Sequence, residues 1–571
     1  MRFLLTIVFS FAIILTQGQS PAHKWVDSVY HSLSKEERIA QLMVVRLSEL
    51  DTKSGKVTYY DQKVLEWINK YNIGGVLIFQ GNPDKQAEMI NQIIKAAKTP
   101  VMFSIDGEWG LAQRMPDSIM ALPKPMMLGA MRDSSLMYDY GKLVAEQCKR
   151  LNIHMNYAPV IDVNNNLDNP VINDRSFGED KNKVAAFGIQ YMRGMQDNGV
   201  MACAKHFPGH GDVSVDSHLD LPIINKSLSQ LKQLELFPFE QLFRAGVASV
   251  MVAHLFIPSI DATPNTPTSV SSKAIEQLLQ KDLHYEGLVI TDGLEMQGVQ
   301  KFFPKGKAAA AALIAGNDIL CLPGEVPDAM DAIKTAIKEK KLHWHDIEKK
   351  CKKVLMAKYN YVLSGNNEIT NNNLVYNLNR GIAEMRTLVA QQAITLIAKT
   401  NNDFFPLSIG RKVAYVGIGI NNDNEFAKLF RSKFNAEIFY LDLSGNSLQK
   451  INILLEELKR FDQVVVGIHN TKRTPAGNFG IGKDVVSFYN SLQAQNKVMG
   501  FLFGNAYAAK NWCNAQNFAV AYEDDSIVQQ VAMEMLLGTS PFKGVLPVTV
   551  CKQFSYGFGI TSYVDKKKVM P

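Results

Sequence analysis

Eight short apolar segments recur in the first two-thirds of the chain and alternate with stretches that have the amphipathic spacing of helices. They cover residues 42–45, 75–79, 101–105, 155–158, 201–204, 249–252, 288–291 and 319–322. Near-continuous apolar segments are typical of strands buried on both faces, and their alternation with helices indicates a parallel sheet. Eight such units over about 300 residues predict a (β/α)8 barrel, although an open doubly wound sheet shows the same alternation.

A second alternating region follows, with apolar segments at residues 413–418, 437–443, 463–468, 498–503 and 519–522. It predicts a smaller doubly wound α/β sandwich domain. We therefore divide the chain into a catalytic barrel over residues 22–365, a helical connector over 366–400 and a C-terminal domain over 401–571. The Gly417-Ile418-Gly419 turn lacks the third glycine of a dinucleotide site, because Asn422 stands there, so we expect no nucleotide binding.

The first residues have the pattern of a secretory signal peptide. Arg2 precedes an apolar run over residues 3–15, and Thr16-Gln17-Gly18 completes the segment. We expect residues 1–18 to direct export to the periplasm or the extracellular space. The run is shorter than the ~20 residues that cross a bilayer, so we expect no stable membrane insertion.

Composition excludes few functions but disfavours nucleic-acid binding. The chain has 61 basic and 55 acidic residues, a formal net charge of +6, and they are spread along the sequence. None of the six cysteines forms a C-x-x-C pair, so we predict buried free thiols with neither a metal nor a redox role. They are Cys148, Cys203, Cys321, Cys351, Cys513 and Cys551.

Polar residues collect just after the predicted strands. They are Arg46, Asp106, Lys205, His206, His254 and Asp292. One polar residue after a strand is usually a cap, but residues from five separate strands indicate the mouth of a barrel, where active sites lie.

The densest polar stretch begins Lys-His-Phe-Pro-Gly-His-Gly-Asp at residue 205 and ends Asp216-Ser217-His218. Its glycines and proline predict a loop. Asp216 can hold the tautomer of His218, which then donates a proton to a leaving group and takes one from water. A metal site is the alternative, but Pro208 and Gly209 oppose the helix that the spacing of His206 and His210 would need.

Asp292 ends the seventh predicted strand and is followed by Gly293. A carboxylate in that place can attack an anomeric carbon and stabilise an oxocarbenium-like transition state. The alternative for Asp292 is a helix N-cap. Glu295 is a second carboxylate nearby, but we expect its later position to point it into the following helix.

Two further segments carry candidate substrate contacts. Asp106 can accept hydrogen bonds from sugar hydroxyls, and Arg114 and Arg175 can donate to ring substituents. Taken singly, each arginine is more often part of a surface ion pair.

Together these segments resemble glycoside hydrolase family 3, specifically its β-N-acetylglucosaminidase branch, over residues 25–363. The K-H-F-P-G-H-G…D-S-H stretch is the most specific feature. The resemblance implies Asp292 as nucleophile and an Asp216–His218 dyad as general acid/base. It also implies a C-terminal α/β sandwich domain and a set of substrate contacts, which are Asp106, Arg114, Arg175, Lys205 and His206.

The function implied is that of a retaining exo-β-N-acetylhexosaminidase acting on peptidoglycan or chitin-type fragments that contain N-acetylglucosamine, with no metal or organic cofactor. Phosphorolysis stays open, because a neutral histidine does not repel phosphate. A β-glucosidase or β-xylosidase and an inactive sugar-binding protein are further alternatives. The chain departs from the branch in its export signal and in Trp109, which replaces a frequent glycine and is expected to reshape the pocket rim.

Overall fold

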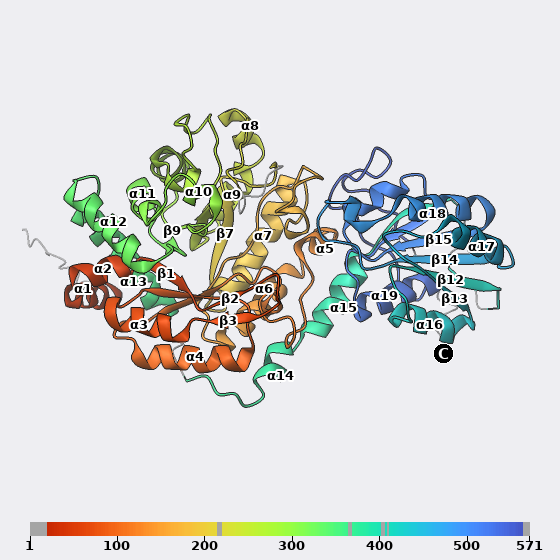
Figure 1. Ribbon diagram of the computed structural model, residues 1–571, viewed down its shortest axis with the longest axis horizontal. Helices are drawn as coiled ribbons and strands as arrows, with labels where there is room; N and C mark the ends of the chain where they lie inside the picture. The colour runs from red at the N-terminus through yellow and green to blue at the C-terminus, as the bar shows by residue number, and fades with distance from the viewer. Residues whose placement is uncertain (1–19, 214–219, 364–367, 401–405, 408–409, 563–571) are drawn as a thin grey trace, which may run out of the picture.

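The computed structural model of the protein describes residues 20–213, 220–363, 368–400, 406–407 and 410–562. Figure 1 shows two domains side by side, with α15 (Ile382–Ala393) lying at the junction between them. The predicted signal peptide lies outside the described residues.

The first domain is the predicted (β/α)8 barrel. Its eight parallel strands are hydrogen-bonded in the order β10-β1-β4-β5-β6-β7-β8-β9. A parallel bridge between Ile290 and Ile319 joins the two edges, where the Thr291 N–H donates to Ile319 O and the Ile319 N–H donates to Val289 O. Each strand matches one apolar segment of the sequence, which rules out the open sheet. The strands are β1 (Met43–Arg46), β4 (Gly75–Ile78), β5 (Met102–Ile105), β6 (Met155–Asn156), β7 (Met201–Phe207), β8 (Ser249–Val252), β9 (Leu288–Thr291) and β10 (Leu320–Cys321).

Helices enclose the barrel on its outer side (Figure 1). A typical one is α4, which begins with Pro83, is capped by the Asn82 side chain and buries Ala87, Ile90 and Ile93 along one face. The longer helices are α1 (Pro21–Ser32), α3 (Asp61–Tyr71), α4 (Pro83–Ala96), α6 (Met137–Arg150), α7 (Lys181–Gln196), α9 (Leu236–Arg244), the π-helix η4 (Lys273–Asp282), α11 (Lys307–Ala315), α12 (Val326–Lys338) and α13 (Trp344–Tyr361). Shorter ones are α2 (Lys35–Ala40), α5 (Pro125–Gly129), α8 (Leu228–Gln233) and α10 (Gln297–Gln300).

The second domain is a doubly wound sheet with the strand order β11-β16-β15-β14-β12-β13. All its neighbouring pairs are parallel except β11 with β16. Its strands are β11 (Thr395–Lys399), β12 (Val413–Ile418), β13 (Glu437–Leu441), β14 (Gln463–Ile468), β15 (Lys497–Leu502) and β16 (Asn517–Val520), and its helices are α16 (Glu425–Phe434), α17 (Leu448–Leu458), α18 (Lys483–Gln495) and α19 (Ser526–Leu537).

We had expected the connector to be helical over its whole length, but its last residues form a strand. It contains α14 (Leu374–Asn379) and α15, but β11 then adds an antiparallel edge strand to the second sheet. The Ile394-Thr395-Leu396-Ile397 segment has the β-branched composition of a strand. It follows the amphipathic helix α15 directly, without a Gly or Pro between them, so the sequence does not mark the boundary. A hairpin of β2 (Ser48–Leu50) and β3 (Val57–Tyr59), which the sequence reading missed, lies just beyond β1.

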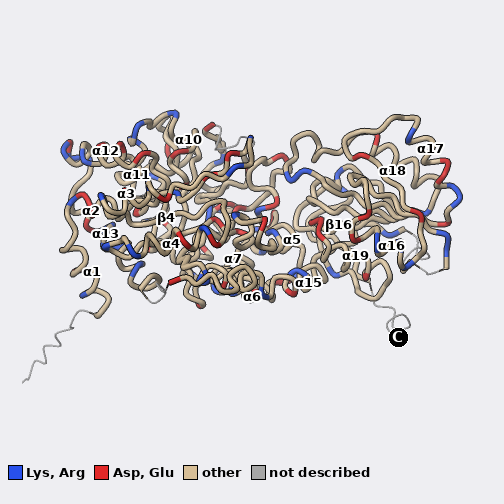
Figure 2. The backbone as a smooth tube through the Cα atoms, turned by 60° about the horizontal axis from the view of Figure 1, so that its bottom comes forward, with Lys and Arg blue, Asp and Glu red and all other residues tan. Residues whose placement is uncertain are grey.

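Basic and acidic positions are interspersed along both domains, as Figure 2 shows. The net charge of +6 is therefore distributed and not concentrated in one segment. Across the described ranges, every helix is too short or too polar to cross a bilayer.

The prediction of free thiols is correct for four cysteines and wrong for two. Cys148, Cys203, Cys321 and Cys351 are buried and reduced, whereas Cys513 and Cys551 form a disulfide within the second domain. Their separation of 38 residues hides the pairing from a reading of local spacing.

The disulfide should stabilise the second domain. Closing a loop of this length lowers the entropy of the unfolded chain, which corresponds to about 4 kcal/mol in the chain-entropy model. We expect Cys513→Ser with Cys551→Ser to lower the unfolding temperature measured by calorimetry, and dithiothreitol to lower that of the wild type similarly. Cys148→Ser would control for loss of a cysteine alone. An unchanged unfolding temperature in the double variant would contradict the expectation.

Candidate active site

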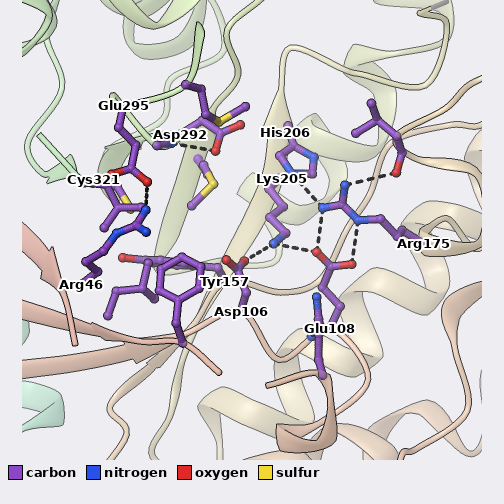
Figure 3. Close-up of a pocket in the computed structure, with 18 of the residues that line it drawn as sticks. Arg46, Asp106, Glu108, Tyr157, Arg175, Lys205, His206, Asp292, Glu295 and Cys321 are labelled. Carbon is purple, nitrogen blue, oxygen red and sulfur yellow. Dashed lines mark hydrogen bonds and ion pairs between the residues drawn. The ribbon is translucent and has the colours of Figure 1, made fainter. Parts of the chain in front are cut away.

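A cavity of about 360 Å³ opens at the carboxyl ends of the barrel strands. Figure 3 shows its charged side chains in two groups, with Asp292 between them. Six of the predicted residues line it: Asp106, Arg114, Arg175, Lys205, His206 and Asp292. Side chains far apart in the sequence therefore converge on one volume large enough for a sugar ring.

Lys205 is the centre of the larger group. It belongs to β7, which runs on through Phe207, whereas the sequence pattern indicated a loop after residue 204. Its ammonium lies 2.6 Å from Asp106 Oδ1 and 2.9 Å from Glu108 Oε1, and Lys205 is only 1% exposed. Two carboxylates compensate the charge of this buried ammonium, so the lysine is fixed in place.

Two arginines complete this group. Arg114 donates from Nη2 to Asp106 Oδ2 at 2.9 Å. Arg175 forms a bidentate pair with Glu108, at 2.7 Å and 2.9 Å. We call Asp106, Glu108, Arg114, Arg175 and Lys205 the charge cluster. Its planar bidentate pair and its remaining donors and acceptors suit the recognition of ring hydroxyls.

The charge cluster keeps its members ionised. Burial alone would raise the pKa of Asp106 and Glu108, but nearby cations outweigh it: Lys205 and Arg114 for Asp106, and Arg175 and Lys205 for Glu108. The net pKa is lowered for Asp106 and falls well below the ordinary value for Glu108. Burial likewise lowers the pKa of Lys205, yet Asp106 and Glu108 raise it overall.

His206 is oriented by Asp162, a residue that the sequence reading missed. Its Nδ1 lies 2.7 Å from Asp162 Oδ2, and its Nε2 lies 3.2 Å from Arg175 Nη2. Asp162 is fully buried and also accepts the backbone N–H of His210 at 2.7 Å. Although burial raises the pKa of Asp162, the His206 charge and hydrogen bonds lower it overall. The carboxylate thus fixes the imidazole ring plane at the cavity wall.

Asp292 follows β9 directly. Its backbone N–H donates to Val252 O at 2.9 Å, and the Gly293 N–H donates to its Oδ1 at 2.8 Å. His254 Nε2 donates to Gly293 O at 2.9 Å and so stabilises this turn. The next helix, α10, begins at Gln297 with Met296 as its N-cap, so Asp292 is not a helix cap.

The smaller charged group consists of Arg46 and Glu295. Glu295 lines the cavity and forms an ion pair with Arg46 (Figure 3). Our expectation that Glu295 points into the next helix is therefore wrong, because that helix starts two residues later.

Asp216 and His218 lie outside the described residues, so their predicted dyad stays a prediction. In the ranges that the structure describes, no three or more histidine, cysteine, aspartate or glutamate side chains are gathered as a metal site.

The second domain reaches the loops beside the charge cluster through Arg473, in the loop after β14. Its guanidinium forms a bidentate pair with Asp174, both distances being 2.8 Å, and lies over the Trp109 ring, 5.1 Å from its centroid. Trp109 is 8% exposed and does not line the cavity, contrary to the expected change at the pocket rim. It instead forms a buried support for this interdomain contact.

Comparison with known proteins agrees with this architecture. Residues 34–357, more than half of the chain, match the N-terminal domain model of glycosyl hydrolase family 3. A β-hexosaminidase A from Pseudoalteromonas piscicida is 28% identical over 393 residues, a match that covers 63% of this chain and 65% of that protein. A β-hexosaminidase from Thiobacillus denitrificans is 33% identical over 267 residues, or 45% of this chain and 73% of that protein.

A solved structure of similar organisation is that of a glycoside hydrolase family 3 β-N-acetylglucosaminidase from Paenibacillus sp. str. FPU-7. It is 26% identical, has a TM-score of 0.74, and the match covers 91% of this chain and 99% of that one. The likeness thus extends over both domains.

Glu108 should be essential to the stability of the barrel mouth. Replacing it with alanine leaves Lys205 and Arg175 buried without their shared carboxylate, which costs about 3–5 kcal/mol at sites of this kind. We expect Glu108→Ala to lower the free energy of unfolding in urea by that amount. Glu88→Ala is the control: its pair with Lys85 spans 3.6 Å and Glu88 is 55% exposed, so a loss below about 1 kcal/mol is expected. Equal losses would refute the assigned role.

Proposed function

The chain belongs to glycosyl hydrolase family 3 and is a glycoside hydrolase, and from this premise we propose that it is a retaining exo-β-N-acetylhexosaminidase. It would release terminal β-linked N-acetylglucosamine from peptidoglycan or chitin-type fragments. The relatives named above support the choice of sugar, and the export signal predicted in residues 1–18 supports action outside the cytoplasm. The Cys513–Cys551 disulfide favours the same location, since disulfides persist in oxidising compartments.

One observation carries the proposal: the buried charge cluster faces Asp292 across a cavity the size of one sugar unit. Lys205 and Asp106 offer a donor and an acceptor to hydroxyls at one end of the ring. The anomeric carbon at the other end of the ring would then lie beside the carboxylate of Asp292. Fixed charges that need not rearrange during the reaction stabilise the transition state more effectively than mobile ones.

In the first chemical step, an oxygen of Asp292 bonds to the anomeric carbon while the bond from that carbon to the leaving oxygen breaks. His218, to which we assign Asp216 as the partner carboxylate, would give its proton to the leaving oxygen. In the second step water attacks the anomeric carbon, its proton passes to His218, and Asp292 is released. Two inversions restore the β configuration, and the pair of steps needs no cofactor.

Arg473 ties this chemistry to the second domain. Asp174 is the neighbour of Arg175, and Trp109 is the neighbour of Glu108. The contacts of Arg473 with Asp174 and Trp109 therefore hold both loops of the Glu108–Arg175 pair from outside the cavity. Asn505 adds a bond from Nδ2 to Asn173 Oδ1 at 2.5 Å, beside the same loop. The second domain thus positions part of the sugar-binding wall.

The first test compares 4-nitrophenyl N-acetyl-β-glucosaminide with the matching β-glucoside, in phosphate and in phosphate-free buffer. We expect turnover of the former, independent of phosphate, with release of free N-acetylglucosamine. Asp292→Ala should lower kcat by at least ~10³-fold because the nucleophile is lost, and it should keep sugar binding measured by calorimetry. Asp331→Ala, exposed and remote, is the control. Formation of sugar 1-phosphate, or turnover of the glucoside alone, would overturn the proposal.

Arg473→Ala should reduce kcat/KM for the N-acetylglucosaminide on the order of tenfold, because small displacements of binding groups are costly in rate. Arg473→Lys should recover only part of the loss, since lysine cannot form the bidentate pair. Arg460→Ala removes a surface pair with Glu437 elsewhere in the same domain and should leave the rate unchanged. A loss equal in Arg473→Ala and Arg460→Ala would contradict the positioning role.

A further inference from the structure

A second cavity, of about 410 Å³, adjoins the catalytic one at the barrel mouth. Its walls are the end of β1, the strand β2, the first two turns of α3 and the loops after β9 and β10. We call it the β1–β10 groove. Three residues line both cavities: Arg46, Glu295 and Leu322. The groove and the catalytic cavity therefore share part of one wall.

We propose that the β1–β10 groove binds the leaving group of the substrate, and that this leaving group is an uncharged hexosamine unit of an oligosaccharide. The proposal rests on the proposed function, because it takes the charge cluster as the binding site of the terminal sugar.

The position of the groove follows from the order of groups in Figure 3. Asp292 lies between the charge cluster on one side and the Arg46–Glu295 pair on the other. A pyranose whose hydroxyls at the far end bind Lys205 and Asp106 presents its anomeric carbon to Asp292. The bond to the leaving group then continues away from the charge cluster, toward Arg46 and Glu295.

The opposite direction is closed. Beyond the Glu108–Arg175 pair lie Trp109 and then Arg473, which is paired with Asp174. The interdomain cavity behind them has its acidic side chains in pairs as well, for example Glu523 with Arg386. A second sugar unit cannot extend through this wall.

The boundary of the groove is an ordered polar wall. Arg46 pairs with Glu295 and also with Glu49, at 3.0 Å, and its guanidinium lies 5.1 Å from the centroid of the Phe79 ring. Glu49 accepts the hydroxyl of Tyr60 at 2.6 Å. These contacts fix donors and acceptors in advance of binding, which reduces the entropy lost when a saccharide is ordered.

The far wall offers similar groups. Lys63 lies 2.8 Å from Glu325 Oε1 and over the ring of Trp67, 4.8 Å from its centroid. Lys63 and Glu325 are 42% and 61% exposed, so both are accessible to hydroxyl and amide groups of a ligand.

Charge narrows the class of leaving group. Three carboxylates line the β1–β10 groove, those of Glu49, Glu295 and Glu325, against two cations, Arg46 and Lys63. The excess negative charge disfavours a leaving sugar that carries its own carboxylate. It accepts a neutral N-acetylhexosamine, as in chitin-type fragments.

The test compares two substrates that share the terminal sugar. In N,N′-diacetylchitobiose the leaving group is a hexosamine. In the 4-nitrophenyl glycoside it is nitrophenol, which has no sugar hydroxyls. We expect Lys63→Ala to lower kcat/KM for the disaccharide about tenfold, as for a lost charged hydrogen bond, and to change that for the nitrophenyl glycoside less than about twofold. Tyr60→Phe, which removes one hydroxyl, should show the same selectivity. Lys70→Ala, exposed on the same helix, is the matched control.

Equal effects of Lys63→Ala on both substrates, or no effect on either, would overturn the groove proposal. The proposed function would still stand in that case, provided that the wild type hydrolyses the nitrophenyl glycoside. Absence of that hydrolysis would instead overturn the proposed function. Binding of diacetylchitobiose to Asp292→Ala with and without Lys63→Ala gives a readout that does not depend on turnover. The wild type should also prefer diacetylchitobiose to the same disaccharide bearing a lactyl ether on its reducing sugar, and the reverse preference would refute the charge argument.

Discussion

The barrel mouth depends on one interaction, the insertion of the Lys205 ammonium between the carboxylates of Asp106 and Glu108. An ammonium this deeply buried is stable only when opposite charges surround it. The two carboxylates in turn are stabilised by second cations, Arg114 for Asp106 and Arg175 for Glu108. The group is therefore interdependent, and each loop that supplies a member is held in one position. A site for sugar hydroxyls results directly from the requirement that buried charges be paired.

The barrel supplies the members in a way that a single loop cannot. Lys205 is on a strand, Asp106 and Asp292 directly follow the ends of two others, and the second domain braces the loops of Glu108 and Arg175 through Arg473. Parallel strands deliver their carboxyl ends to one rim, so residues close to those ends need little loop to reach the cavity. Residues farther along, such as Arg175, require support from another part of the chain.

This difference explains which features were predictable from sequence. The eight barrel strands are contiguous apolar runs, and Asp106, Lys205 and Asp292 lie at or next to their ends, so periodicity and position identified them. Asp162 stands four residues after its apolar run, and Arg473 belongs to another domain, so neither spacing nor local composition marks them. Glu295 was misjudged because the start of α10, two residues later, is not visible in the sequence pattern. The Cys513–Cys551 pair was missed because only the fold brings the two together.

The two sides of Asp292 are built differently, and the contrast accounts for exo action within the proposed function. On the side of the charge cluster, buried ion pairs, Trp109 and the second domain close the cavity behind one sugar ring. On the side of Arg46 and Glu295, the cavity adjoins the β1–β10 groove, whose charged residues are partly exposed. A glycan therefore enters with its terminal unit first, and the rest of the chain stays on the open side. Closure at one end determines that cleavage removes single terminal residues.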